Sequence, residues 1–120
     1  MKYITMPIQE VIDRYTICLL KVERLPNDDV QAMKDQARYY LEGIDMDTMS
    51  NYVTKMYKAN ADIWDTEHDI RKGVMDDADK AVIGELALKV RDLNCARTLV
   101  KNEIAEEFGG FKDVKMNYGS

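Results

Sequence analysis

The sequence has only two cysteines and one histidine, too few for the usual zinc sites or for a disulfide framework. It contains no Gly-rich phosphate loop and no nucleophile motif of the serine or cysteine hydrolases. It also lacks the run of about 18 apolar residues that a membrane span needs, and its first residues form no apolar signal core. We therefore expect a cytoplasmic protein with no membrane partner and no metal or other cofactor.

The two cysteines and the histidine themselves favour ordinary structural roles. Cys18 and Cys95 lie among apolar residues in segments with helical spacing, which is typical of buried thiols in a reducing compartment. His68 stands between Glu67 and Asp69, without a nucleophile nearby in the sequence. We expect a surface imidazole there.

Length and charge limit the class of protein. A chain of 120 residues fits a single helical domain over residues 1–120, and 46% hydrophobic with 32% charged residues is ordinary for a soluble globular protein. A net charge of −5 argues against nucleic acid as a partner of the whole surface. A local basic pocket stays open, because net charge averages over patches.

Apolar residues recur at helical spacing in four segments separated by Gly, Pro or Asp. The predicted helix starts are Pro7, Asn27 or Asp28, Asp45 or Asp47, and Asp76 or Asp77. The predicted ends lie near Arg24, Gly43, Gly73 and Gly109. The inner face of the third segment is marked by Met49, Val53, Met56, Ile63 and Ile70. That of the fourth is marked by Val82, Ile83, Leu86, Val90, Leu93, Val100 and Ile104.

The last two predicted helices are long, about 25 and 30 residues, or roughly 35 to 45 Å each. The short break between them makes an antiparallel hairpin. Such a hairpin is too long for a compact monomer of this size to cover, so we expect a homodimer that buries its exposed half. The predicted fold is all-α, an antiparallel helical bundle built on a long hairpin, and residues 111–120 are predicted to form an extended C-terminal tail.

Gly84 lies inside the fourth predicted helix, where glycine costs about 1 kcal/mol relative to alanine. One interpretation is that it permits the close approach of another helix. The other interpretation is that Gly84 has no structural or functional role.

Charged and aromatic residues form stripes on three of the predicted helices. Helical spacing aligns Asn60 with Trp64, and Asp13 lies near Lys21 and Arg24 in angle. If the stripes converge, they form a cationic cleft for an anionic small molecule or for the acidic segment of a protein partner. The candidate ligand-binding residues are Lys21, Arg24, Trp64, Glu67, Arg71, Asn94, Arg97 and Lys101.

Within that cleft, three cations would take the anion: Arg71, Arg97 and Lys101. Glu67 would orient Arg71, and Trp64 would stack on the ligand. The alternative is a set of surface ion pairs at helical spacing, such as Glu67 with Arg71, each worth about 0.3–0.5 kcal/mol.

A different hypothesis is an enzyme. Asp62 with Asp65, and Glu103 with Glu106, each place two carboxylates on one helix face. This is similar to the all-α nucleotide pyrophosphatases, although Asp replaces Glu in the first pair. It implies a Mg²⁺-dependent hydrolase acting on a nucleotide or another phosphorylated substrate, with Mg²⁺ required only in this alternative.

Three segments together resemble a family of small helical proteins without an assigned function, found in bacteria and tailed phages. They are residues 8–17 followed by Lys21 and Arg24, residues 63–71, and residues 94–104. His68 stands where the family has an acidic residue. The resemblance implies a helical fold and emphasises the charged stripe residues, which favours a polar network or a site. It also suggests a third hypothesis, a phage factor acting on a host protein.

Overall fold

The computed structural model describes residues 6–26 and 29–109, and within them the chain forms four α-helices and no strand. They are α1 (Ile8–Arg24), α2 (Val30–Leu41), α3 (Met46–Met75) and α4 (Lys80–Phe108). The predicted antiparallel bundle built on a long hairpin is confirmed. None of the described helices is long and apolar enough to cross a membrane.

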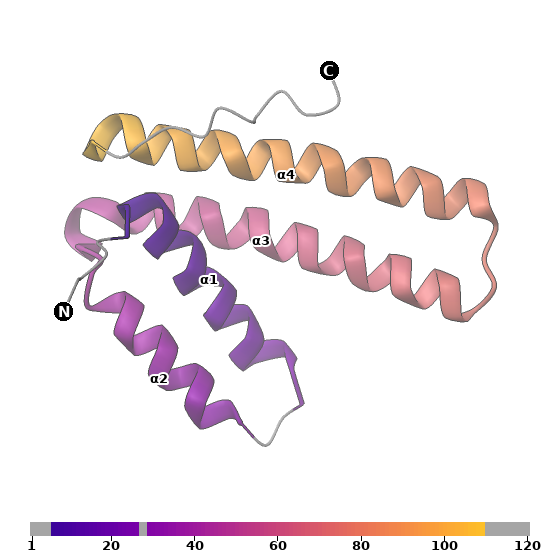
Figure 1. Ribbon diagram of the computed structural model, residues 1–120, viewed down its shortest axis with the longest axis horizontal. Coiled ribbons are helices and arrows are strands. Elements are labelled where there is room, and N and C mark those ends of the chain that lie inside the picture. Colours follow the sequence, from indigo (N-terminus) through magenta and orange to yellow (C-terminus); the bar gives the residue numbers. More distant parts are fainter. Residues whose placement is uncertain (1–5, 27–28, 110–120) are drawn as a thin grey trace.

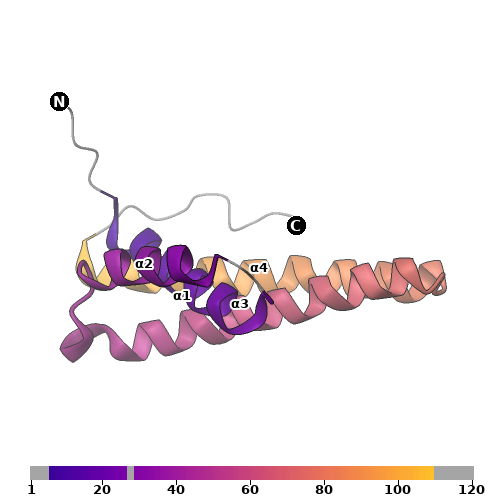
Figure 2. The same ribbon diagram turned by 90° about the horizontal axis from the view of Figure 1, so that it is seen from below.

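The two long helices lie side by side, and the two short ones cover only part of them. In Figures 1 and 2, α1 and α2 lie at the end of the hairpin where α3 begins and α4 ends, and the loop end extends beyond them. Helix α1 contacts both long helices, whereas α2 packs on α1. The bundle is therefore closed at one end and reduced to two helices at the other.

The seam between α3 and α4 follows a coiled-coil spacing. Its positions alternate steps of three and four residues, as in a heptad repeat, and most of them are apolar. The same spacing selects two polar residues on α3, Asn60 and Glu67, and one on α4, Arg97. Asn60 and Arg97 lie at the level that α1 crosses, where they meet a further polar residue described below.

The hydrophobic core lies at the closed end of the hairpin. Ile12 of α1, Met56 of α3 and Ile104 of α4 have no exposed surface, and they pack with Ile44 and Val53. Burying a side chain of this size contributes about 1.5–3 kcal/mol. The three central residues thus join three helices at one point.

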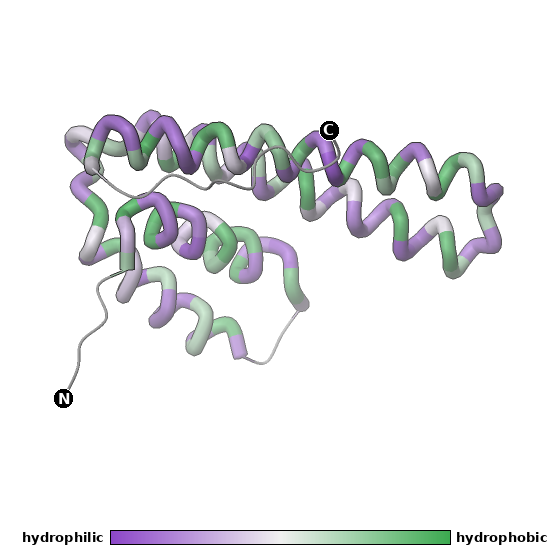
Figure 3. Tube along the Cα trace, turned by 45° about the horizontal axis from the view of Figure 1, so that its top comes forward, coloured by the Kyte–Doolittle hydropathy of each residue, from purple (hydrophilic) through white to green (hydrophobic). Residues whose placement is uncertain are grey.

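Beyond the core, the hairpin has no buried residue. We call residues 67–93 the distal arm, and every one of them is half-buried or exposed. Four of its large apolar side chains are open to solvent, Val74 at 61%, Met75 at 85%, Val82 at 51% and Leu88 at 53%. Figure 3 shows hydrophobic positions continuing along both helices of this arm. The prediction that Val82 lines the inner face is wrong, because Ile83 takes the seam and its neighbour points about 100° away.

The loop between the long helices differs from the prediction. Helix α3 continues through Gly73 to Met75, and Asp77 adopts the left-handed conformation with a φ of 56°. The amide of Ala78 donates to the Gly73 carbonyl at 2.8 Å and that of Asp77 to the Val74 carbonyl at 3.3 Å, the pattern of a Schellman end. The predicted stop at Gly73 is therefore wrong, since an aspartate supplies the left-handed residue.

The remaining helix ends mostly follow the prediction. Asp45 caps α3 by accepting from the Asp47 amide, and Gly109 ends α4 with a φ of 87°. The cap of α4 is Asp79, which accepts from the Ala81 amide, so the prediction of Asp76 or Asp77 is wrong. Helix α2 follows Asp29 and ends two residues before Gly43. The predicted caps Asn27 and Asp28 and the predicted tail at 111–120 lie outside the described residues.

Candidate functional site

A buried carboxylate joins α1 to both long helices. Asp13 is 2% exposed, and Arg97 binds it with two nitrogens, the Nε donating to Oδ1 at 2.9 Å. Asn60 Nδ2 donates to the same Oδ1 at 2.9 Å and to Thr16 Oγ1 at 2.9 Å. The Thr16 hydroxyl in turn donates to the Asp13 carbonyl at 2.8 Å. Every one of these polar groups is thus engaged, as a buried network requires.

A second ion pair extends this cluster. Lys101 Nζ lies 2.8 Å from Glu10 Oε1 and 3.8 Å from Asp13 Oδ2, with 14% of the lysine side chain exposed. Two cations therefore face two carboxylates, so the cluster is balanced in charge. We call it the Asp13 network, and it consists of Glu10, Asp13, Thr16, Asn60, Arg97 and Lys101.

The network changes the acidity of its members. Burial alone would raise the pKa of Asp13, but the hydrogen bonds from Arg97 and Asn60, together with the charges of Arg97 and Lys101, outweigh it and lower that pKa. The hydrogen bond to Asp13 raises the pKa of Arg97 against the opposite effect of burial, and the charge of Glu67 adds to the rise. Both shifts favour the charged pair.

The lowered pKa of Asp13 predicts a loss of stability in acid. The folded-state value lies below the unfolded-state value of about 3.9, so the contribution of this carboxylate is complete above that pH. It is lost as the pH falls from there through the folded-state pKa. We expect the free energy of unfolding to fall less steeply below about pH 4 in Asp13→Asn than in the unaltered protein. Urea titrations over a pH series measure both slopes, and parallel curves would contradict the prediction.

The structure brings together part of the predicted site. Arg97 and Lys101 meet at Asp13, and Glu67 lies close enough for its charge to act on Arg97. Glu10 and Thr16 are not among the predicted site residues. The sequence feature that could have identified these two residues is spacing, since each lies three residues from Asp13 on the same face of α1.

The other predicted residues have different surroundings. Arg24 forms an ion pair with Asp65, and Lys21 lies near Cys18, where burial raises the pKa of the thiol and the lysine charge lowers it by less. Within the described residues, none of these joins the Asp13 network. The same holds for Trp64 and Asn94, which are half-buried, and for Arg71, which is exposed.

Three of the four carboxylates of the hydrolase alternative form ion pairs with cations. Asp62 pairs with Lys58 at 3.1 Å, and Glu103 pairs with Lys55 at 3.4 Å. Asp65 is the partner of Arg24. No group of three or more metal-ligating side chains occurs within residues 6–26 and 29–109. The arrangement therefore adds no support to the hydrolase alternative, which stays a prediction.

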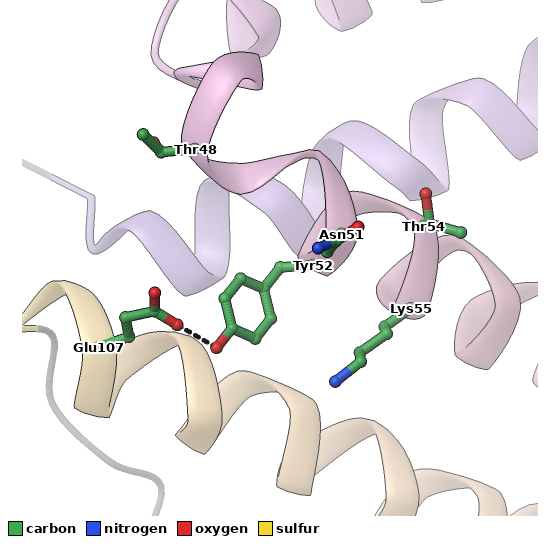
Figure 4. A pocket seen from close by; sticks show the side chains of 6 residues that line it. All are labelled: Thr48, Asn51, Tyr52, Thr54, Lys55 and Glu107. Atoms are coloured by element: carbon green, nitrogen blue, oxygen red, sulfur yellow. Dashed lines mark hydrogen bonds between the residues drawn. The ribbon is translucent and has the colours of Figure 1, made fainter.

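A shallow polar pocket of about 430 Å³ lies at the closed end of the hairpin, away from the predicted site (Figure 4). Tyr52 donates to Glu107 across it, and this bond raises the tyrosine pKa. Lys55 Nζ lies 5.5 Å from the centre of the Tyr52 ring. Most of its polar groups thus have partners, since Lys55 pairs with Glu103 and the hydroxyls of Thr48 and Thr54 donate to backbone carbonyls. It is lined by Thr48, Asn51, Tyr52, Thr54, Lys55 and Glu107.

Comparison of the chain with protein-family models, with curated proteins and with solved structures finds no match. The resemblance to a family of small bacterial and phage proteins therefore stays a prediction.

Proposed function

We propose that this chain is a helical interaction protein that acts as a homodimer, with the long hairpin as its binding element. The observation that carries the proposal is the distal arm, which has no buried residue and exposes four large apolar side chains. Apolar patches that a protein leaves exposed commonly mark interaction sites. The arm also extends beyond the helices that could cover it (Figure 2).

The Asp13 network supports the proposal as a structural element. Its two cations already bind two carboxylates, and Asp13 is almost fully buried. An anionic ligand would have to displace Asp13 or Glu10 from Arg97 and Lys101. We infer that the network fixes α1 against the hairpin and so holds the distal arm in a defined direction.

The ligand and enzyme hypotheses make a separate prediction. A thermal-shift panel of nucleotides and sugar phosphates, with and without Mg²⁺, tests them on the unaltered protein. A ligand at a hundred times its dissociation constant would stabilise the protein by about 2.7 kcal/mol. The hypothesis of a phage factor acting on a host protein would use the same arm, but it gives a protein that stays monomeric until its partner is added.

Sedimentation equilibrium over a hundredfold dilution tests the homodimer. We expect a dimer that dissociates on dilution, as mass action requires. Replacing both Val82 and Leu88 with lysine should shift the protein to monomer, because it places charge on the apolar surface of the arm. The matched control is Tyr39→Lys, at a side chain on α2 that is 72% exposed and lies outside the arm. A monomer at every concentration would contradict the proposal.

A further inference from the structure

The face of α4 that points away from α3 carries a second row of apolar and small residues. Successive members are separated by three, four, seven and four residues, so they share one stripe about half a turn from the seam. Leu88 is 53% exposed and Leu99 is 49% exposed. In Figure 1, α1, α2 and α3 all lie on one side of α4, and no other described helix covers the opposite side. We call this row the outer stripe, and it consists of Ala81, Gly84, Leu88, Cys95 and Leu99.

Gly84 has no side chain and so leaves a gap in the outer stripe. A Cβ atom added at Gly84 would meet no atom within 4 Å, so this glycine is not needed for packing inside its own chain. A glycine in the middle of a helix costs about 1 kcal/mol relative to alanine. A large side chain from another helix could enter the gap without a clash.

The outer stripe is complementary to itself when read in the opposite direction. In an antiparallel pair of α4 helices with a two-fold axis between residues 91 and 92, Leu99 lies opposite Gly84 of the second copy. Leu88 then lies opposite Cys95 of the second copy. Each large side chain therefore meets a smaller residue, the arrangement by which helix surfaces interlock.

The charges at the centre fit the same register. Arg91 and Asp92 are exposed and form an ion pair with each other within one chain at 3.2 Å. About the same two-fold axis, Arg91 faces Asp92 of the second copy, and the symmetry repeats this contact. The single register that matches large with small residues therefore also matches opposite charges.

These observations favour a second copy over another kind of partner. We propose that two chains associate through their outer stripes in the antiparallel register centred between Arg91 and Asp92. The complementarity lies within one sequence, which is the condition for a two-fold interface. The distal arm carries seven acidic and five basic residues, so it offers no strong field of one sign to attract a highly charged partner. This inference rests on the proposed homodimer and specifies its interface.

Charge reversal at the two central residues tests the register. Arg91→Asp and Asp92→Arg each bring like charges together twice, so we expect each variant alone to dissociate at least about tenfold more readily. An equal mixture of the two variants should restore association as a heterodimer, since two aspartates then face two arginines. Native mass spectrometry of copies that differ in mass measures this, and circular dichroism checks that both variants stay helical.

A disulfide provides an independent measurement. In the proposed register, a cysteine at position 88 faces Cys95 of the second copy, so oxidised Leu88→Cys should form a covalent dimer. Within one helix these positions are about 10.5 Å apart, beyond the roughly 6.8 Å that a disulfide spans. Lys89→Cys is the matched control, exposed on the same helix but about 100° off the stripe.

The outcomes separate the inference from the proposed function. Rescue by mixing together with the specific disulfide supports the register. If the dimer is unaffected by charge reversal and forms no disulfide, the proposed register is wrong and the proposed homodimer still stands. A monomer in every sample overturns both.

Discussion

Replacing Asp13 with alanine is expected to lower the free energy of unfolding by about 3–5 kcal/mol, the usual cost of breaking a buried ion pair by removing one partner. The variant leaves the guanidinium of Arg97, only 27% exposed, without its carboxylate. It also removes one of the two acceptors of the Asn60 amide and leaves the Thr16 hydroxyl as the other. Urea denaturation measures the change, and an unaltered m-value would show that the unfolded states are comparable.

Two further variants identify the cause. Asp65→Ala removes a carboxylate that is 62% exposed and paired with Arg24, so it should cost less than about 1 kcal/mol. Arg97→Ala should be as destabilising as Asp13→Ala if the network is structural, because Asp13 then stays buried without its two hydrogen bonds from the guanidinium. If Arg97→Ala instead keeps the stability of the unaltered protein, Arg97 is available for a ligand, as the cationic-cleft hypothesis requires.

The helices could be predicted because their signals are local. Apolar spacing and the punctuating glycines, prolines and aspartates predicted the four helices and the long hairpin. The loop of the hairpin was predicted less accurately than the helices. The end of α3 depends on which residue takes the left-handed conformation, and both Gly73 and Asp77 are able to do so. The bonds of Asp77 and Ala78 to the last turn decide between them, and these form only in the folded loop.

The polar network could be predicted only in part. Helical spacing placed Asp13, Asn60, Arg97 and Lys101 on stripes, but the way in which one helix is rotated against another is not encoded in a single stripe. Distance along α1 explains why Arg24, a predicted site residue, does not join the network. Arg24 lies eleven residues after Asp13, about 16 Å along the helix axis, and so binds Asp65 instead. The predicted cations Arg97 and Lys101 therefore lie in a cluster that is balanced in charge.

Met56→Ala is the second variant for which we expect a large effect, a loss of about 2–5 kcal/mol in the free energy of unfolding. Met56 has no exposed surface and lies in the core cluster with Ile12 and Ile104. Truncation leaves a cavity where α1, α3 and α4 meet, and a packed core relaxes only partly around a cavity. Urea denaturation again measures the loss.

The matched control is Met75→Ala, the same substitution on the same helix at a side chain that is 85% exposed. Met75 lies at the loop end of the distal arm and outside the outer stripe, so its truncation should change stability by less than about 0.5 kcal/mol. The contrast would locate the stability of the fold at its closed end, and amide hydrogen exchange should then show earlier opening near Met75 than near Met56. A loss at Met75 as large as that at Met56 would contradict this contrast, because it would mean that stability is not concentrated at the closed end.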